Sequence, residues 1–191
     1  MSSRGTLIVI SAPSGGGKST VIKEIRKRRP DITYSISCTT RPIRHYEKEG
    51  VHYYFLTKEE FEHRIAAGRF LEWEEVHGNL YGTDHDTIEE SLEAGKNVLL
   101  DIDVNGGEAI QQSFPDSLLI FLYPPSLEDL RRRLKERGSD DDVSIERRLS
   151  RYAMEKEKGD AYPFRIVNDD LEKTVMAVIK LIEDHTAKPQ G

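Results

Sequence analysis

The amino-acid sequence predicts an α/β fold built around a parallel sheet. Three near-continuous apolar runs, at Leu7–Ser11, 97–103 and 117–123, are typical of strands that are buried on both faces. Segments with helical spacing of apolar residues follow them, as crossover connections between parallel strands require. A glycine-rich break separates the first apolar run from the first helical segment. The sequence therefore favours a three-layer core with helices on both faces of the sheet.

The remaining core elements continue this alternation. Phe164–Val167 is a fourth, shorter strand candidate, and apolar residues with helical spacing follow it at Leu171, Val175, Val178 and Ile182. The helical segments that follow the four strands span residues 18–29, 105–113, 126–137 and 171–185.

Two stretches, 33–96 and 126–158, do not fit this alternation. The first holds short alternating segments rich in Tyr, Thr and Val, which predict a small second sheet. Its strands are expected at 32–38, 52–55 and 70–76, and its helices at 58–67 and 84–94. The second stretch is an almost wholly charged helical segment. We therefore expect a single domain over 1–191, made of a core (1–32, 97–125 and 159–191) and two inserted lobes (33–96 and 126–158).

The composition excludes several classes of protein. The 191 residues carry 34 acidic and 28 basic side chains, and a net charge of −6 disfavours a nucleic-acid binder. The longest apolar run, Leu118–Tyr123, is far shorter than the roughly 20 residues that a membrane helix needs. Cys38 is the single cysteine, which excludes an intramolecular disulfide and fits a reducing compartment. We expect a cytoplasmic protein that binds neither nucleic acid nor membrane, and the sequence leaves its oligomeric state open.

The glycine-rich break has the residues of a phosphate-binding loop, or P-loop. It comprises Ala12, Pro13, Ser14, Gly15, Gly16, Gly17, Lys18, Ser19 and Thr20. Glycines let backbone N–H groups point inward around phosphate oxygens, Lys18 reaches the β- and γ-phosphates, and the Ser19 hydroxyl joins a Mg²⁺ shell. The strict pattern has glycine where Ala12 stands, so we expect Gly15 and Gly17 to adopt the tight geometry. The alternative is a glycine-rich turn whose lysine and serine are surface residues.

Two carboxylates follow the strand predicted at 97–103. A carboxylate at the carboxyl end of a neighbouring parallel strand is where a P-loop enzyme holds Mg²⁺, directly or through water. Asp101 is the candidate for this role. The alternative is an aspartate that caps the helix beginning near Asn105, and the two roles could be divided between Asp101 and Asp103.

Seven further segments resemble the guanylate kinase family. They occur in the family's order, and the resemblance runs from about residue 6 to residue 185. The segments are 37–44 (SCTTRPIR), 50–55 (GVHYYF), 70–73 (FLEW), 78–83 (GNLYGT), 100–103 (LDID), 124–130 (PPSLEDL) and 167–170 (VNDD). The resemblance implies a P-loop core, a GMP-binding lobe over 33–96 and a mobile lid over 126–158.

The resemblance also implies a site for the GMP phosphate. The residues at the matching positions are Arg41, Arg44, Tyr53 and Tyr81. Guanidinium forks and phenol O–H groups are suitable donors to a dianion. The alternative is that the arginines are exposed loop charges and that the tyrosines pack the small sheet.

By the same resemblance, Glu72 reads the base. A carboxylate only accepts hydrogen bonds, and guanine presents adjacent N1–H and N2–H₂ donors that adenine lacks. An adenine would therefore leave a buried charged acceptor unpaired, which costs several kcal/mol. Ser37, Thr83 and Asp103 are expected to complete the base pocket. The alternative for Glu72 is a salt bridge on a strand edge.

The charged segment over 126–158 supplies the other implied residues. The resemblance makes Arg133, Arg137 and Arg148 the lid arginines that clasp the ATP phosphates and the transferring group. Lys18, Arg133 and Arg148 would be catalytic, and Arg137 and Asn168 would bind ATP, the latter at the adenine. The alternatives are a solvated helix face for the arginines and turn formation for Asn168.

The implied function is transfer of the γ-phosphoryl group of Mg²⁺-bound ATP to GMP, and also to dGMP, giving ADP and GDP in purine nucleotide metabolism. Ser19 and Asp101 would hold the Mg²⁺. Two alternatives stay open. One is a non-catalytic guanylate-kinase-like module that binds proteins, and the other is a P-loop kinase for another small phosphorylated acceptor.

Overall fold

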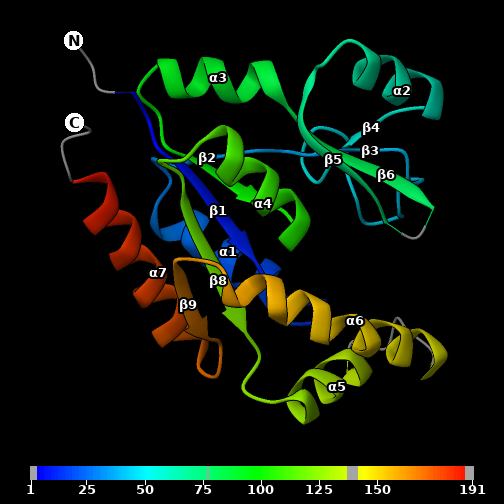
Figure 1. The fold of residues 1–191 in the computed structure, drawn as a ribbon, viewed down its shortest axis with the longest axis vertical. Coiled ribbons are helices and arrows are strands. Elements are labelled where there is room, and N and C mark those ends of the chain that lie inside the picture. Colours follow the sequence, from blue (N-terminus) through cyan, green and yellow to red (C-terminus); the bar gives the residue numbers. More distant parts are fainter. Residues whose placement is uncertain (1–3, 77, 137–141, 188–191) are drawn as a thin grey trace.

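The core is a five-stranded, wholly parallel sheet (Figure 1). The computed structural model describes residues 4–76, 78–136 and 142–187. In the sheet the strands lie in the order β2 (Thr33–Tyr34), β7 (Val98–Asp101), β1 (Leu7–Ser11), β8 (Leu118–Tyr123) and β9 (Phe164–Val167). Strand β1 is central, so its carboxyl end delivers the P-loop to the middle of the sheet edge.

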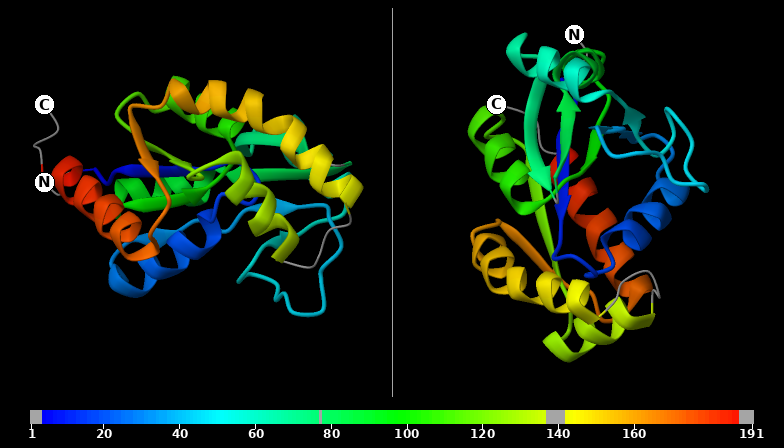
Figure 2. Two further views of the ribbon diagram at one scale, coloured as in Figure 1. Left: turned by 90° about the horizontal axis from the view of Figure 1, so that it is seen from below. Right: turned by 90° about the vertical axis from the view of Figure 1, so that its right-hand side faces the viewer.

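Helices cover both faces of this sheet, as the sequence predicts. Helices α1 (Lys18–Arg28) and α7 (Leu171–Thr186) lie below the sheet in the left view of Figure 2. Helices α3 (His85–Glu93) and α4 (Val104–Ser113) pack against the opposite face. The layers bury two apolar clusters, and successive residues of a buried strand supply them alternately.

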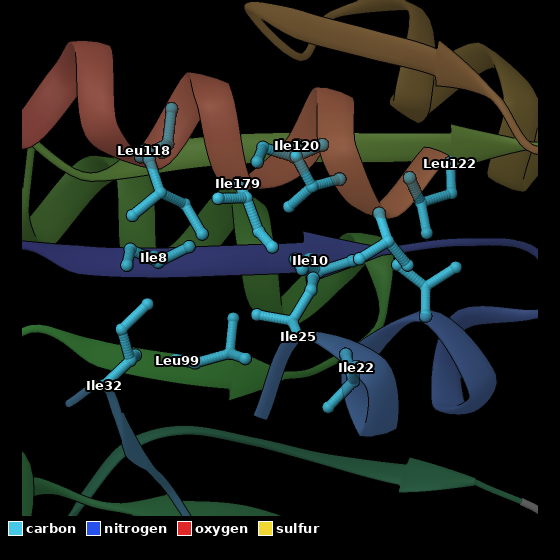
Figure 3. Close-up of a cluster of buried hydrophobic side chains, with 14 of the residues drawn as sticks. Ile8, Ile10, Ile22, Ile25, Ile32, Leu99, Leu118, Ile120, Leu122 and Ile179 are labelled. Carbon is cyan, nitrogen blue, oxygen red and sulfur yellow. The ribbon is translucent and has the colours of Figure 1, made fainter. Parts of the chain in front are cut away.

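Strand β1 shows this division most clearly. Ile8 and Ile10 point into the cluster beneath α1 and α7, where they meet Ile25, Leu99 and other aliphatic side chains (Figure 3). Leu7 and Val9 point into the cluster beneath α3 and α4. All four β1 side chains are almost completely buried, which explains why the strand reads as a continuous apolar run.

A second sheet forms a separate lobe, which we call the small-sheet lobe. Its strands lie in the order β4 (Tyr54–Phe55), β3 (Cys38–Thr39), β6 (Asn79–Asp84) and β5 (Phe70–Val76). The sheet is mixed, because β3 pairs parallel with β4 while the other pairs are antiparallel. Helix α2 (Lys58–Ala66) covers it through one fully buried phenylalanine.

Two helices form a further unit, which we call the helical pair. Helix α5 (Leu127–Glu136) and helix α6 (Asp142–Asp160) pack through Leu130, Leu134 and Ile145. Figure 1 shows the helical pair and the small-sheet lobe on two sides of the core strands' carboxyl ends. No described helix is long and apolar enough to cross a membrane.

The structure corrects three details of the sequence interpretation. The small sheet contains a further strand, β6, that the sequence interpretation did not include. The other two details concern the connections between lobe and core. The strand expected at 32–38 is two short strands in different sheets, since Thr33–Tyr34 pairs with β7 of the core and Cys38–Thr39 belongs to the small-sheet lobe. Helix α3, expected within the inserted lobe, packs its buried Ile88 and Leu92 against the core. Both elements lie at the connections between lobe and core.

Candidate active site

Two adjoining cavities open at the carboxyl ends of β1 and β7, where ligands bind in open α/β sheets. One has a volume of about 280 Å³ and is lined by the P-loop, and the other has about 330 Å³ and is lined by the small-sheet lobe. They share Ser14, Lys18, Val76 and Asp103. A larger cavity of about 540 Å³ lies at the amino ends of β1 and β8, away from the P-loop. The shared wall makes the first two cavities one continuous candidate site.

The P-loop has the backbone geometry expected for an anion cradle. Gly15 and Gly17 have φ values of 87° and 90°, which confirms that these two glycines adopt the tight conformation. Gly17 is the N-cap of α1 and has no side chain that could occupy the N–H groups of the first turn. The amino end of α1 therefore directs both its dipole and its N–H donors toward the loop. A Cβ atom on Gly17 would lie 2.4 Å from Nδ2 of Asn168.

Lys18 and Asp101 form an ion pair at the base of the P-loop. The Lys18 Nζ lies 2.7 Å from Oδ1 of Asp101 and donates to the Ile102 carbonyl at 2.8 Å. Ser19 is exposed in the first turn of α1. A hydroxyl and a carboxylate are hard oxygen donors that fit Mg²⁺, which commonly takes the rest of its shell from phosphates and water. Among the described residues there is no group of three or more His, Cys, Asp or Glu side chains placed to bind a metal without such a ligand.

Asp103 has a structural role of its own. It is the N-cap of α4, and its Oδ1 accepts hydrogen bonds from the backbone N–H groups of Asn105 (2.9 Å) and Gly106 (3.0 Å). The capping alternative therefore holds for Asp103, while Asp101 points to Lys18. Because Asp103 also lines both cavities, the start of α4 is fixed against the site.

Glu72 on β5 lies deep in the second cavity. The Thr83 hydroxyl donates to its Oε1 at 2.5 Å, and a Cβ on Gly106 would come within 2.8 Å of its Oε2. Burial raises the pKa of Glu72 to about 7, against the lowering effect of the Thr83 hydrogen bond, and the Asp103 charge raises it further. Thr83 is fully buried, so it supports the carboxylate from behind. Ser37 and Tyr53 line the same cavity. An ionised Glu72 can therefore accept further hydrogen bonds from a ligand in this cavity.

The predicted phosphate residues are only partly brought together. Arg41 makes a two-pronged pair with Glu47, with N–O distances of 2.7 and 3.1 Å, and its guanidinium lies 5.5 Å from the Tyr53 ring centre. Tyr81 lies against Tyr53 with 5.9 Å between ring centres. Arg44 is exposed and donates to the Tyr46 hydroxyl at 2.9 Å. The pairing with Glu47 is a contact that the sequence interpretation missed.

The predicted arginines of the helical pair contact the P-loop itself. Arg148 donates to Oγ of Ser14 at 2.8 Å, and Arg133 donates to the carbonyls of Gly16 (3.3 Å) and Asn168 (2.8 Å). The Asn168 side chain donates to the Gly16 carbonyl at 2.8 Å and lines a third cavity of about 380 Å³ with Arg133. Arg133 and Asn168 thus brace the loop from the side away from Glu72. The predicted Arg137 lies outside the described residues.

Three charged lining residues were missed by sequence reasoning. Arg151 and Glu155 line the P-loop cavity, and Glu74 lines the Glu72 cavity. Arg151 and Glu155 are three and seven positions beyond Arg148, so helical spacing would have placed them on the same side of α6. Glu74 shares a face of β5 with Glu72 because strand side chains repeat every two residues.

The fold and the site define a P-loop nucleotide-binding protein with a second pocket beside the phosphate loop. The family model for guanylate kinase matches residues 4–185. The chain belongs to the guanylate kinase family.

Individual relatives agree with this assignment. The chain is 45% identical to a guanylate kinase of Synechococcus sp. (strain JA-3-3Ab), covering 94% of this chain and 82% of that protein. It is 44% identical to a guanylate kinase of Symbiobacterium thermophilum, covering 97% and 88% respectively. The crystal structure of guanylate kinase from Anaplasma phagocytophilum aligns with a TM-score of 0.81 at 34% identity, covering 97% of this chain and 88% of that one. The predicted fold class and family are confirmed.

Proposed function

We propose that this chain transfers the γ-phosphoryl group of ATP to GMP or dGMP, giving ADP and the corresponding nucleoside diphosphate in purine nucleotide metabolism. The observation that carries the proposal is the half-buried acceptor Glu72 in a cavity that shares a wall with the P-loop cavity. A donor nucleotide and an acceptor nucleotide would thus meet with their phosphates at Ser14 and Lys18. This specific pair of pockets supports an enzyme over a protein-binding module.

The acceptor site assigns each end of GMP to a different group. Ionised Glu72, held by Thr83, accepts from N1–H and N2–H₂ of guanine, and Ser37 and Asp103 complete the base pocket. The GMP phosphate would lie near Tyr53 and Tyr81. There it would replace Glu47 as the hydrogen-bonding partner of the Arg41 guanidinium. Arg44 would also bind the phosphate, after its hydrogen bond to the Tyr46 hydroxyl is broken.

The donor site holds the triphosphate. The P-loop from Ala12 to Thr20 wraps the phosphates, and Lys18 turns from Asp101 to the β- and γ-phosphates. Ser19 and Asp101 would then hold Mg²⁺, which would supply positive charge to neutralise the phosphates. Arg133, Arg148 and the predicted Arg137 supply further positive charge, and Asn168 lies beside the cavity expected to take adenine.

The transfer itself asks the protein for positioning and charge stabilisation. The attacking atom is a phosphate oxygen that is already ionised at neutral pH, so no side chain has to remove a proton from it. The negative charge on the phosphoryl group in the transition state is stabilised by Lys18, Arg133 and Arg148. In this assignment the small-sheet lobe, within 33–96, is the GMP-binding lobe and residues 126–158 are the lid. Their closure on the core (1–32, 97–125 and 159–191) excludes water, which would otherwise hydrolyse ATP.

The function is tested by an ADP-release assay with GMP, dGMP, AMP, CMP and UMP as acceptors. We expect ADP release with GMP and dGMP, and at least about 10³-fold lower kcat/KM with AMP. No ADP release with any acceptor would favour the protein-binding module. Equal activity with a different acceptor would favour another P-loop kinase.

Arg41→Ala is expected to weaken GMP binding far more than ATP binding, because its guanidinium lies near Tyr53, which lines the acceptor cavity. The size of the loss should be about 2 kcal/mol or more, as for a charge-assisted hydrogen-bonded pair. Calorimetry with each nucleotide separately measures both affinities. Equal losses for both nucleotides would place Arg41 in the shared cleft or indicate unfolding, which circular dichroism distinguishes.

A further inference from the structure

One side of helix α6 carries a row of four charged residues, three of which line the P-loop cavity. Arg148, Arg151, Glu155 and Lys158 are spaced by three, four and three positions, so they form a single row along the helix. Arg148 reaches the P-loop, as described above. The other three residues contact parts of the molecule to which the sequence interpretation assigned no link.

Arg151 lies between two carboxylates on different units. Its Nε is 3.6 Å from Oε1 of Glu155 on the same helix, and its Nη2 is 3.9 Å from Oε1 of Glu74 on β5 of the small-sheet lobe. By contrast, Arg131 of the helical pair contacts Glu146 within the pair. Arg151 therefore forms an electrostatic contact from the helical pair across to the small-sheet lobe.

Glu74 is held in place on the other side of this contact. Nδ2 of Asn105, on α4, donates to its Oε2 at 2.9 Å, and Nζ of Lys158 donates to Oδ1 of Asn105 at 2.5 Å. Burial raises the pKa of Glu74 to about 7, and the neighbouring Asp103 carboxylate acts in the same direction, while Arg151 lowers it. The ionised form of Glu74 therefore gains from the approach of Arg151.

Glu155 fixes the other end of Arg151. Glu155 is only 7% exposed, and its Oε2 is buried without a hydrogen-bond partner among the residues that the structure describes. Burial raises its pKa, and Arg151 is the strongest of the influences that lower it. A buried carboxylate of this kind retains its cation, which holds the Arg151 side chain at the wall of the P-loop cavity.

We propose that Arg151 is a positioning residue that couples the ATP side of the site to the GMP side through Glu74 and Glu155. The inference rests on the proposed function, since it assigns the P-loop cavity to ATP and the Glu72 cavity to GMP. GMP fixes β5 through Glu72, two positions from Glu74, and ATP fixes α6 through Arg148, three positions from Arg151. Bound GMP thereby orders Glu74, and bound ATP orders Arg151. Each nucleotide therefore favours formation of the Glu74–Arg151 pair.

The coupling is reciprocal by thermodynamic necessity. If a bound ATP analogue tightens GMP binding by a given factor, bound GMP tightens the analogue by the same factor. An exposed surface ion pair would contribute little to such a factor. The side chains of Glu74 and Arg151 are 18% and 31% exposed and Glu155 is buried, so this pair is more shielded than an exposed surface ion pair and the contribution of Arg151 should be measurable.

The test is calorimetry at pH 8, where Glu74 is ionised, with GMP and an ATP analogue whose γ-phosphoryl group cannot be transferred. Each Kd is measured alone and with the other nucleotide saturating, which gives the coupling factor. Arg151→Ala should lower this factor about three- to tenfold while each Kd measured alone changes less. Arg151→Lys, which keeps the charge, should retain part of the factor.

Two further variants separate coupling from general damage. Arg147→Ala removes a neighbouring exposed cation of α6 and should leave the coupling factor unchanged. Glu74→Gln should lower the factor, and adding Arg151→Ala to it should lower the factor no further. Additive effects of the two substitutions, or an unchanged factor in Arg151→Ala, would overturn the proposal. A wild-type protein that binds both nucleotides with no coupling would do the same, whereas one that does not bind GMP would contradict the proposed function itself.

Discussion

Glu72→Gln is expected to lower kcat/KM for GMP by roughly 30- to 1,000-fold, which corresponds to a loss of about 2–4 kcal/mol. Glutamine keeps the shape of the side chain but replaces one carboxylate oxygen with an NH₂ group, which donates where guanine also donates. Adenine loses nothing comparable, because its N1 acceptor and N6–H₂ donor can match an amide. The preference for GMP over AMP should therefore narrow through the fall in GMP activity. A folded variant with unchanged preference would remove the base-reading role from Glu72.

The same substitution should remove a pH effect. The pKa of Glu72 is raised to about 7 in the folded protein, so the ionised carboxylate is disfavoured when no guanine is bound. Guanine binding requires the ionised carboxylate, because both groups that guanine presents are donors. In the wild type, GMP affinity should fall as the pH drops below about 7, and Glu72→Gln should flatten this dependence relative to the wild type.

The same variant is expected to change the pH dependence of protein stability. A raised folded pKa means that the carboxyl group's contribution to stability is present below its unfolded pKa and is lost as the pH rises through 7.

The nucleotide-free Glu72→Gln protein should consequently gain stability relative to the wild type at pH 8 but not at pH 4. Thermal unfolding at the two pH values measures this difference. An equal change in Tm at both values would show that desolvation of the Glu72 charge has no part in the stability of the empty site.

Arg148→Ala is expected to lower kcat by at least about a hundredfold while changing the GMP Kd little. In the structure Arg148 faces the P-loop through Ser14, on the donor side of the shared wall. A cation that contacts the transferring group mainly in the transition state lowers kcat when it is removed, and an arginine in such a position contributes about 10³–10⁵ in rate.

Steady-state kinetics with GMP, together with calorimetry of GMP binding, measures both quantities. Arg147→Ala is the matched control, because it removes the adjacent exposed arginine of the same helix. If GMP binding collapsed while kcat held, Arg148 would be a ground-state anchor for the acceptor.

The core of the fold could be predicted because its signals are local and redundant. Strands β1 and β8 are buried on both faces, so they are almost continuously apolar. The glycines that follow β1 lie between a strand and a helix, which is the setting that a phosphate loop requires. The small-sheet lobe is harder to predict. Its strands β3 and β4 are two residues long each, and the Thr33–Tyr34 strand is equally short, so no periodicity can assign them to one sheet or the other.

The candidate site could be predicted only where a residue lies in a distinctive segment. Glu72 is one of three glutamates on β5, and the segment FLEW distinguishes it from the other two. Arg151 lies in a helix where many residues are charged, and composition cannot separate the arginines that face the P-loop from those that face solvent. The Arg41–Glu47 pair escaped prediction for a related reason, because a loop gives no periodic constraint on which charges meet.

The order of strands has a consequence for the protein as it leaves the ribosome. Strand β1 is made first, but its neighbours in the sheet come late: Leu7 pairs with Val98, and Ile8 pairs with Leu118. At a synthesis rate of about 5–20 residues per second, β1 and the loop after it wait roughly 5–20 s for the first of these partners. Asn168, which braces Gly16, is made later still. The nascent chain thus carries an unpaired apolar strand until Val98 has been made, and its nucleotide-binding loop is fully braced only after Asn168 has been made.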